Sequence, residues 1–313
     1  MKIWAAAVGI MLGATGCNGC NDPAAKPDGP DPDAAIDARP DASPPRCDPS
    51  KPFGIPTPMT ELNTGAQDIH AYFTPDELTV YFASSRAGNG DWDIYQASRA
   101  SQTAPFDAPV LVSGVNSLLN DSLPAITDDG LTLFGTRIVV TPSYETDIFS
   151  STRTSISSAF APLVYNPTFS SANRDEGIAF LPDRTAVFWS ERAGSSGSHG
   201  IFTAVWNGTS YATPMPLYDF TFSDQNLVSG VLMTPDQLTL YFSSTKSLSQ
   251  IDIWMTTRAS TGVPFPEPTN VSELNSPEQE HTSWLSRDGC VIAFSRNNLT
   301  NSNSDLYLAR KPQ

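Results

Sequence analysis

The stretch TPDELTVYF, residues 74–82, decides the fold of this chain, because close copies of it return four more times. The copies are TDDGLTLFG from Thr127, LPDRTAVFW from Leu181, TPDQLTLYF from Thr234 and SRDGCVIAF from Ser286. Successive aspartates in the copies are 53, 54, 53 and 52 residues apart. A constant step of this size is typical of a repeat protein, in which each copy is one supersecondary unit.

Two further elements keep the same step. WDIYQASR from Trp92 has counterparts that begin at Thr146, His199, Ile251 and Ser304. FGIPTPMTELN from Phe53 has counterparts that begin at Phe106, Phe160, Tyr211 and Phe265. Each copy thus contains four short stretches rich in aromatic and β-branched residues, which favour strands. In the first copy the expected strands are residues 69–73, 79–83, 93–97 and 110–113, with Pro-Asp turn chemistry between the first two.

Four antiparallel strands per unit, repeated around an axis, form the blades of a propeller. We therefore predict an all-β fold, a five-bladed β-propeller of four-stranded antiparallel blades, over residues 51–313. The repeats cover about 53–105, 106–159, 160–210, 211–264 and 265–313. The chain begins with an outer strand that has no blade of its own. This strand is expected to join the last blade and close the ring, which protects the sheet edges.

The repeats resemble a known family. PDELTVYFASSRAGNGDWDIY and PDQLTLYFSS followed by DIW are similar to the WD40-like repeats of TolB-type propellers. That pattern has a Pro-Asp-Gly turn, an apolar strand ending in Phe-x-Ser, and then Asp-Ile-Tyr. The chain departs from it where Glu77, Arg184 and Gln237 replace the turn glycine, and it lacks the separate N-terminal domain of TolB. The resemblance implies the fold and does not imply the partners of TolB.

The N-terminus predicts an export signal over residues 1–16. Lys2 supplies a positive charge, and residues 4–14 form an apolar stretch too short to span a bilayer as a helix. Ala14-Thr-Gly-Cys17 resembles the bacterial lipobox, with Ala14 in place of the usual Leu. We therefore expect lipidation at Cys17, and the alternative is plain cleavage that releases a secreted protein.

Residues 17–50 have the composition of a spacer. They are rich in Pro, Ala and Asp and contain no aromatic residue, so they cannot bury enough apolar surface to offset the cost of ordering. A lipid at Cys17 would make them a disordered tether, which places the protein in the bacterial cell envelope, with the outer membrane or cell surface favoured. Export permits disulfides. Ring closure would bring Cys47 to the fifth repeat, so Cys47 with Cys290 is the preferred pair, and a buried free Cys290 is the alternative.

Charge and motifs exclude several classes of function. The formal charge of −15 repels phosphate backbones, so nucleic acid is not an expected partner. The chain has no Gly-x-Ser-x-Gly elbow and no glycine-rich phosphate loop, and its three histidines are too scattered for a convincing zinc site. We predict no cofactor and expect an envelope protein or a glycan as partner.

One position in the repeat could carry function. Eight residues before each turn aspartate lie Asp68, Asp121, Asp175, Val228 and Glu280, with Glu176, His70 and His281 beside them. Carboxylates that converge at one mouth of the channel could hold Ca²⁺ or act as the acid and base of a glycosidase. The alternative is structural, because a carboxylate that recurs in four copies can serve each blade in the same way. Trp92, Trp189, Trp254 and Trp284 are expected to pack between sheets.

The sequence thus predicts a non-enzymatic envelope lipoprotein whose propeller is a recognition scaffold for a protein or a ligand. Recognition is expected on the loops that differ most between copies, residues 86–92, 138–146, 193–200 and 297–304. The alternative is a carbohydrate-active, glycosidase-like propeller that uses the carboxylates named above.

Overall fold

The computed structural model describes residues 46–88, 91–140, 144–191, 200–221, 228–246 and 250–313. The expected export signal, Cys17 and residues 17–45 of the expected tether lie outside the described residues. Residues 45–313 form one compact unit. No helix in the described part of the chain is long and apolar enough to cross a bilayer.

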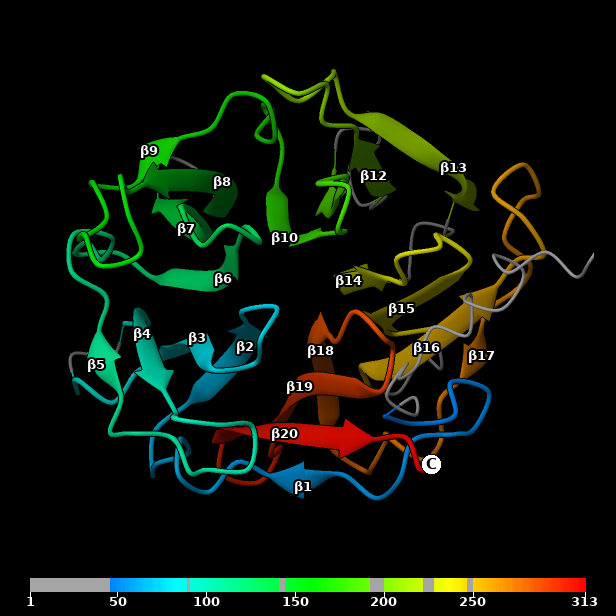
Figure 1. Cartoon of the computed structure of the whole chain (residues 1–313), viewed down its shortest axis with the longest axis horizontal. Helices are drawn as coiled ribbons and strands as arrows, with labels where there is room; N and C mark the ends of the chain where they lie inside the picture. Colours follow the sequence, from blue (N-terminus) through cyan, green and yellow to red (C-terminus); the bar gives the residue numbers. More distant parts are fainter. Residues whose placement is uncertain (1–45, 89–90, 141–143, 192–199, 222–227, 247–249) are drawn as a thin grey trace, which may run out of the picture. The chain divides into compact units, whose positions relative to one another are not determined.

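The described strands form five antiparallel sheets of four strands, arranged as blades around an axis (Figure 1). Blade 1 contains β2 (Asp68–Phe73), β3 (Thr79–Ser84), β4 (Asp93–Ser98) and β5 (Val110–Leu111). Blade 2 contains β6 (Asp121–Ile126), β7 (Thr132–Val140), β8 (Tyr144–Thr152) and β9 (Val164–Tyr165). Blade 3 contains β10 (Asp175–Phe180), β11 (Ala186–Ser190), β12 (Gly200–Ala204) and β13 (Met215–Thr221). The predicted all-β, five-bladed propeller is confirmed.

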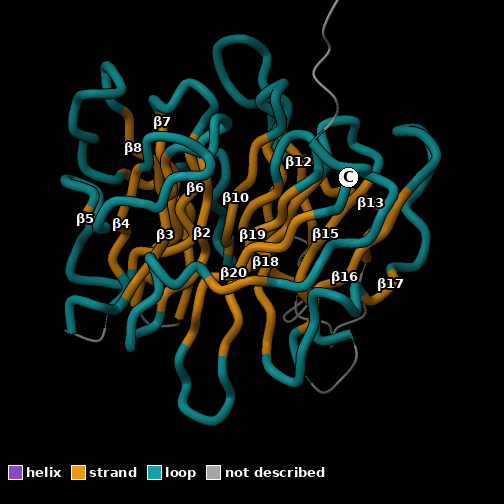
Figure 2. The backbone as a smooth tube through the Cα atoms, turned by 60° about the horizontal axis from the view of Figure 1, so that its bottom comes forward, coloured by secondary structure: helices purple, strands orange, loops and turns teal. Residues whose placement is uncertain are grey.

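The last two blades complete the ring. Blade 4 contains β14 (Val228–Met233), β15 (Thr239–Ser244), β16 (Asp252–Thr257) and β17 (Thr269–Asn270). Blade 5 contains β18 (Gln279–Leu285), β19 (Val291–Asn297), β20 (Ser304–Arg310) and, from the start of the chain, β1 (Thr57–Pro58). The pairs Thr57 with Leu308 and Pro58 with Tyr307 confirm that the first strand joins the last blade. Loops gather at the two ends of the strands (Figure 2).

The repeated aspartates shape the turn between the first two strands of a blade. Asp76 Oδ1 accepts hydrogen bonds from Thr74 Oγ1 at 2.6 Å and from the Leu78 amide at 3.0 Å, and the same pair of bonds recurs at Asp129, Asp236 and Asp288. The next residue is left-handed, with φ of 60° at Glu77 and 67° at Gly130. The positions where the chain departs from the Gly pattern therefore keep the backbone conformation that glycine favours.

A cation on an aromatic ring joins successive repeats. The arginine after the third strand of a blade lies over the first phenylalanine of the next repeat, as in Arg99 over Phe106 at 4.5 Å and Arg153 over Phe160 at 4.4 Å. At the closing seam Lys311 takes this place over Phe53 at 5.0 Å. Arg258 over Phe265 at 4.3 Å repeats the contact in blade 4, whereas in blade 3 Trp206 packs on Tyr211 in its place. Four of the five outer strands are thus held to their blades by a cation on an aromatic ring.

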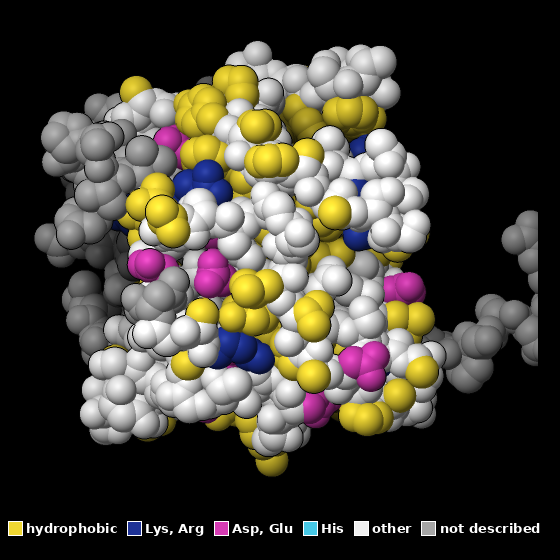
Figure 3. Space-filling view, turned by 90° about the vertical axis from the view of Figure 1, so that its left-hand side faces the viewer, with side chains coloured by type: hydrophobic (Ala, Val, Ile, Leu, Met, Phe, Trp, Pro, Cys, Tyr) yellow, Lys and Arg dark blue, Asp and Glu magenta, His cyan; other side chains and the backbone are white. Residues whose placement is uncertain are grey.

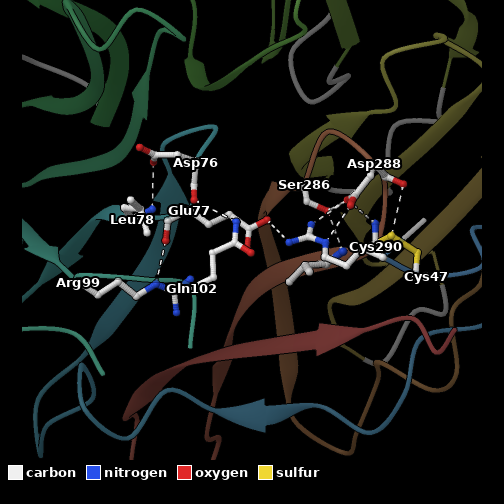
Figure 4. A network of polar contacts seen from close by, with 11 residues as sticks. Cys47, Asp76, Glu77, Leu78, Arg99, Gln102, Ser286, Asp288 and Cys290 are labelled. Atoms are coloured by element: carbon white, nitrogen blue, oxygen red, sulfur yellow. Dashed lines mark hydrogen bonds and ion pairs between the residues drawn. A yellow bond between two sulfur atoms is a disulfide. The ribbon is translucent and has the colours of Figure 1, made fainter. Parts of the chain in front are cut away.

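The closing seam carries additional bonds (Figure 4). Cys47 and Cys290 form a disulfide with a Cα–Cα distance of 5.7 Å, which is the pair preferred from the sequence. Arg46 makes two hydrogen bonds of 2.8 Å to Asp288 in blade 5 and one of 2.5 Å to Glu77 in blade 1. The start of the described chain is therefore fixed to the turn end of two blades.

The strands of blade 2 are longer than the sequence indicated. We expected residues 138–146 to form a loop, but β7 and β8 pair through Ile138 with Thr146, Val139 with Glu145 and Val140 with Tyr144. The β-branched and aromatic residues of this segment favour extended structure, so the ladder continues where the other blades turn.

Four of the outer strands, β1, β5, β9 and β17, have only two residues each. Figure 3 views the side that carries β5 and β9, where hydrophobic groups are interspersed with polar surface. Exposed apolar residues there include Val110, Leu111, Val164 and Tyr165. Short edge strands offer little backbone to another chain and so limit edge-to-edge pairing.

Candidate functional site

The repeated carboxylates begin the inner strands and are almost fully buried. Asp68 Oδ2 accepts hydrogen bonds from the Thr64 amide at 2.6 Å and from Thr64 Oγ1 at 2.8 Å. Its other oxygen accepts from Ser84 at 2.5 Å and from Arg86 at 2.6 Å. Arg86 also donates to the Leu62 carbonyl at 2.6 Å. The carboxylate therefore fastens the incoming loop to its own blade.

The other three carboxylates have equivalent partners. Asp121 accepts from Ser117 and Arg137, Asp175 from Ser171 and Ser190, and Glu280 from Ser276 and Arg296. Burial raises the pKa of Glu280, and the hydrogen bond from Ser276 and the charge of Arg296 oppose that rise only in part. The oxygens of Asp68, Asp121 and Asp175 and Glu280 Oε1 are thus directed at protein donors, whereas Glu280 Oε2 is buried without a partner among the described residues. In the described part of the chain no group of three or more His, Cys, Asp or Glu is placed to hold a metal ion.

A cavity of about 330 Å³ lies on the propeller axis beside these carboxylates. All five blades contribute to its lining, which consists of Gln67, Ile69, His70, Trp92, Leu123, Arg174, Glu176, Gly177, Trp189, Gly230, His281, Ser295, Asn297 and Ser304. Of the predicted site residues, Glu176, His281 and the neighbouring His70 are here. Asp68, Asp121, Asp175 and Glu280 are not among the lining residues. The structure therefore separates the recurring carboxylates from the residues that face the cavity.

A bulge in the inner strands shapes the cavity. In four blades the bulged residue is left-handed, with φ of 57° at His70, 48° at Leu123, 54° at Gly177 and 56° at Gly230. A bulge of this kind re-aims side chains and is common beside binding sites. All four residues line the cavity, so the inner strands expose a ring of irregular backbone to the axis.

The cavity opens at the end of the propeller where the inner strands begin. Beyond the bulges the axis narrows to a space of about 20 Å³. Tyr72 of blade 1 accepts a hydrogen bond from the Phe180 amide of blade 3 at 3.3 Å, and an ion pair between Arg287 and Asp128 links blades 5 and 2. The cavity is therefore a cup that is closed on one side. Arg46 binds at the opposite end of the propeller, at the turns that contain Glu77 and Asp288.

One wall of the cup is an oriented indole. Trp92 Nε1 donates to Gln67 Oε1 at 2.9 Å, and Gln67 Nε2 donates to the Ser302 carbonyl at 2.8 Å. The Trp92 amide donates to Asn120 Oδ1 at 2.8 Å. The expectation that Trp92 packs between sheets was wrong, because these bonds hold the half-buried ring at the cavity.

The wall from blade 3 carries an ion pair. Arg174 Nη2 lies 2.8 Å from Glu176 Oε1, which also accepts a hydrogen bond from Thr146 Oγ1 at 2.7 Å. The Arg174 guanidinium stacks 5.5 Å from the centre of the buried Trp189 ring. Glu176 Oε2 has no hydrogen-bond partner among the described residues. Blade 3 therefore offers the cavity a positioned cation and a free carboxylate oxygen.

Two imidazoles face each other across the cup. The rings of His70 and His281 are 6.3 Å apart at 89°. Burial lowers the pKa of His70 to about 3, helped by the charge of His281, and burial lowers the pKa of His281 to about 4. Both rings are therefore neutral at pH 7. They can donate and accept hydrogen bonds without adding charge to the cavity.

Several buried polar atoms on the lining residues lack partners in the described part of the chain. They are His70 Nδ1, Arg174 Nε and Asn297 Oδ1. Buried polar groups are nearly always hydrogen-bonded, so an unpaired group calls for an explanation such as water or a ligand. Three such groups around one cavity mark it as the best candidate for a binding site.

Sequence reasoning missed the lining residues Gln67, Arg174 and Ser295. The signal was available in the positions on either side of the repeated carboxylate. The preceding residue is Gln67, Asn120, Arg174, Leu227 or Gln279, and the following one is Ile69, Ser122, Glu176, Ser229 or His281. Of these flanking residues, Gln67, Ile69, Arg174, Glu176 and His281 line the cavity, whereas the carboxylate shared by four repeats is structural. Of the predicted recognition loops, 86–92 and 297–304 supply Trp92, Asn297 and Ser304, and 193–199 lie outside the described residues.

No protein-family profile matches the chain, and no curated protein matches it. Solved structures do. The α-L-arabinofuranosidase of Podospora anserina, solved with cellotriose, has a TM-score of 0.54 at 10% identity over 84% of this chain and 98% of that one. An endo-arabinase from Bacteroides thetaiotaomicron has a TM-score of 0.51 at 15% identity over 83% and 97%.

TolB from Acinetobacter baumannii is also similar, with a TM-score of 0.47 at 16% identity over 80% of this chain. The chain spans 57% of the length of that protein. At these identities the likeness concerns the fold alone. Function therefore has to be argued from the site.

Proposed function

We propose that this protein is a non-enzymatic recognition propeller of the bacterial cell envelope that binds a small polar ligand in the axial cavity. The observation that carries the proposal is the set of unpartnered polar atoms on His70, Arg174 and Asn297 around one cup. The volume of about 330 Å³ lies within the usual range for small-molecule sites, roughly 300–1,000 Å³.

The cavity chemistry favours binding over glycoside hydrolysis. A glycosidase needs two carboxyl groups, one as acid and one as base or nucleophile. Glu176 is the one carboxylate among the described residues that line the cup. The carboxylates proposed for catalysis, such as Asp121 and Glu280, are buried and accept hydrogen bonds from arginine and serine. They support the blades and are poorly placed to reach a substrate.

Envelope anchoring is part of the proposal. Its support is the sequence of residues 1–16, the lipobox-like Cys17 and the Pro- and Asp-rich composition up to residue 50. The described chain enters the propeller at the turn end, opposite the mouth of the cup. A tether to a membrane at this end would leave the cup open to the space beyond the membrane, where an envelope glycan or protein ligand could reach it.

The test is ligand capture from a low-molecular-mass extract of bacterial envelopes by the purified full chain. Binding is followed by tryptophan fluorescence and by mass spectrometry of the retained compounds. The test variant is Trp92→Phe, which loses the bond to Gln67. The control is Trp206→Phe, because Trp206 contacts Tyr211 and Arg184 away from the cup.

Retention of a compound by the unmodified chain and by the Trp206 variant, with loss in the Trp92 variant, supports the proposal. Equal retention by all three proteins, or none by any, contradicts it. Cleavage of an added polysaccharide by the unmodified chain would favour the glycosidase alternative. Anchoring is tested separately by membrane release of a Cys17→Ala variant; a variant that stays in the membrane fraction refutes lipidation at Cys17.

A further inference from the structure

The electrostatic balance of the cup restricts the class of ligand. Its described charged residues are Arg174 and Glu176, which lie 2.8 Å apart and neutralise each other. Both imidazoles that face the cup are neutral at pH 7. Arg174 also lies 3.9 Å from Glu191, and the side chains of Arg174 and Glu176 are 39% and 19% exposed. An anion at Arg174 would lie beside two carboxylates, and a cation at Glu176 would lie beside the guanidinium, so like charges oppose a charged ligand of either sign.

The hydrogen-bonding groups of the cup that lack protein partners give a second restriction on the class of ligand. Asn297 Oδ1 is a buried acceptor without a partner, Arg174 Nε is a buried donor without one, and His70 Nδ1 is either, depending on its tautomer. Glu176 adds Oε2 as an acceptor, whereas its Oε1 accepts from Arg174 and Thr146. A hydroxyl group both donates and accepts, so several hydroxyls on one molecule can satisfy this mixed set. A carboxylate or phosphate ligand only accepts and leaves the two acceptors without partners.

An apolar surface completes the cup. The half-buried indole of Trp92 is held by Gln67 and lies in a lining that also contains Leu123 and Ile69. Such a surface covers the C–H face of a saturated ring while the ring's hydroxyls turn to the polar wall of blade 3. The volume of about 330 Å³ is at the low end of small-molecule sites and suits one or two rings.

We infer that the axial cup recognises an uncharged polyhydroxylated ring, that is, a neutral saccharide unit at the end of a glycan or as a free sugar. This inference rests on the proposed function and narrows it to one class of ligand. It requires Glu176 to accept a ligand hydroxyl through Oε2 and to reject anions by its charge.

The test is calorimetric titration of the full chain with sets of sugars that differ only in charge. Each set contains a neutral sugar, its uronic acid and its amino sugar, for example glucose, glucuronate and glucosamine, and equivalent sets are used for galactose and other hexoses, with neutral pentoses alone. Binding of at least one neutral sugar, with its charged counterparts about tenfold weaker or more, is the expected result. A charged member that binds most tightly in its set, or no binding of any sugar, overturns the inference.

A variant that keeps the shape of the Glu176 side chain and removes its charge provides a second test. Glu176→Gln should weaken the neutral sugar about tenfold, because the hydrogen bond to a charged acceptor is lost. It should also bring the uronate closer in affinity to the neutral sugar, because the repelling charge is gone. Glu267→Gln is the control, since its exposed side chain pairs with Lys246 on the outside. Unchanged discrimination in Glu176→Gln contradicts the assigned role.

The results separate this inference from the proposed function. Capture of an envelope compound that depends on Trp92, together with failure of every neutral sugar, refutes the saccharide class and leaves the cup as a ligand site. If no envelope compound is captured and no neutral sugar binds, the proposed function is refuted as well.

Discussion

Replacement of Asp121 by alanine tests whether the repeated carboxylates are structural. The Asp121 side chain is fully buried, and its two oxygens accept hydrogen bonds from the Ser117 amide at 2.6 Å, from Ser117 Oγ at 2.8 Å and from Arg137 Nε at 2.7 Å. The Arg137 side chain is 14% exposed, so it cannot turn fully to water. Its guanidinium would stay over Phe149 without a counter-charge.

The expected cost of Asp121→Ala is about 3–5 kcal/mol of unfolding free energy, the usual loss when one partner of a buried ion pair is removed. Total stabilities are about 5–15 kcal/mol, so this variant should unfold at a clearly lower urea concentration. Asp121→Asn keeps the shape and part of the bonding and should cost about half as much. Asp107→Ala is the control, because Asp107 is exposed in the same repeat and should change stability by less than about 0.5 kcal/mol.

The assay is equilibrium urea unfolding followed by circular dichroism, together with ligand binding by the folded Asp121→Asn variant. The account predicts a lower midpoint and an unchanged affinity. A loss below about 1 kcal/mol for Asp121→Ala, or a normal midpoint with abolished binding for Asp121→Asn, would refute the structural role and restore Asp121 as a functional residue.

Three further perturbations follow from the structure. The double variant Cys47→Ser with Cys290→Ser should have an unfolding free energy lower by about 2–5 kcal/mol, because the start of the described chain is then free to leave blade 5. If reductant leaves the unfolding midpoint of the unmodified protein unchanged, the disulfide does not stabilise the fold. Gly230→Ala should lower the unfolding free energy by more than about 2 kcal/mol, because a Cβ there would overlap the Thr282 carbonyl. In Gly177→Ala the new Cβ meets only Leu123 at 3.7 Å, and the unfolding free energy should fall by about 1 kcal/mol. Equal losses in thermal unfolding would contradict the close packing of blades 4 and 5. His70 and His281 have folded pKa values of about 3 and about 4, below the ordinary 6.5, so between pH 6.5 and 4 the unfolded chain binds more protons than the folded one. The unfolding free energy should therefore fall with falling pH by roughly 1.4 kcal/mol per pH unit for each histidine. This dependence of stability on pH should be weaker in the double variant His70→Asn with His281→Gln. An unaltered dependence across a pH series of urea midpoints refutes the burial of neutral imidazoles.

The fold could be predicted because its determinants recur. The Asp-centred turn recurs five times, and each repeat starts with an aromatic residue, Phe in four copies and Tyr211 in one, so the repeats together resolve what one copy leaves ambiguous. The first strand has no blade of its own, and ring closure gives it a partner. The turn at Glu77 was also readable, because its aspartate carries the bonds that allow a left-handed residue to follow. The extension of β7 and β8 was not, because strand length depends on which partner the ladder finds, and only one blade departs from the rest.

The cup could be predicted only in part. Glu176, His70 and His281 were identified through their position next to the repeated carboxylate, whereas Asp68 and its equivalents were not separable from them in a one-dimensional pattern. The separation arises because successive strand residues point to opposite faces. It also depends on the bulge, which turns His70 and Leu123 to the axis. Trp92 was assigned to packing because an aromatic residue beside a strand usually packs. The hydrogen bond that holds it at the cavity, donated by Trp92 Nε1 to Gln67 Oε1, joins residues 25 positions apart.

A crystal structure of the protein with the neutral saccharide that binds it most tightly is the decisive experiment. We expect density for a sugar ring in the axial cup, against Trp92 and with a hydroxyl within hydrogen-bond distance of Glu176 Oε2. Density at the turn end, on the outer strands or on the buried carboxylates, with the cup filled only by water, would contradict this expectation.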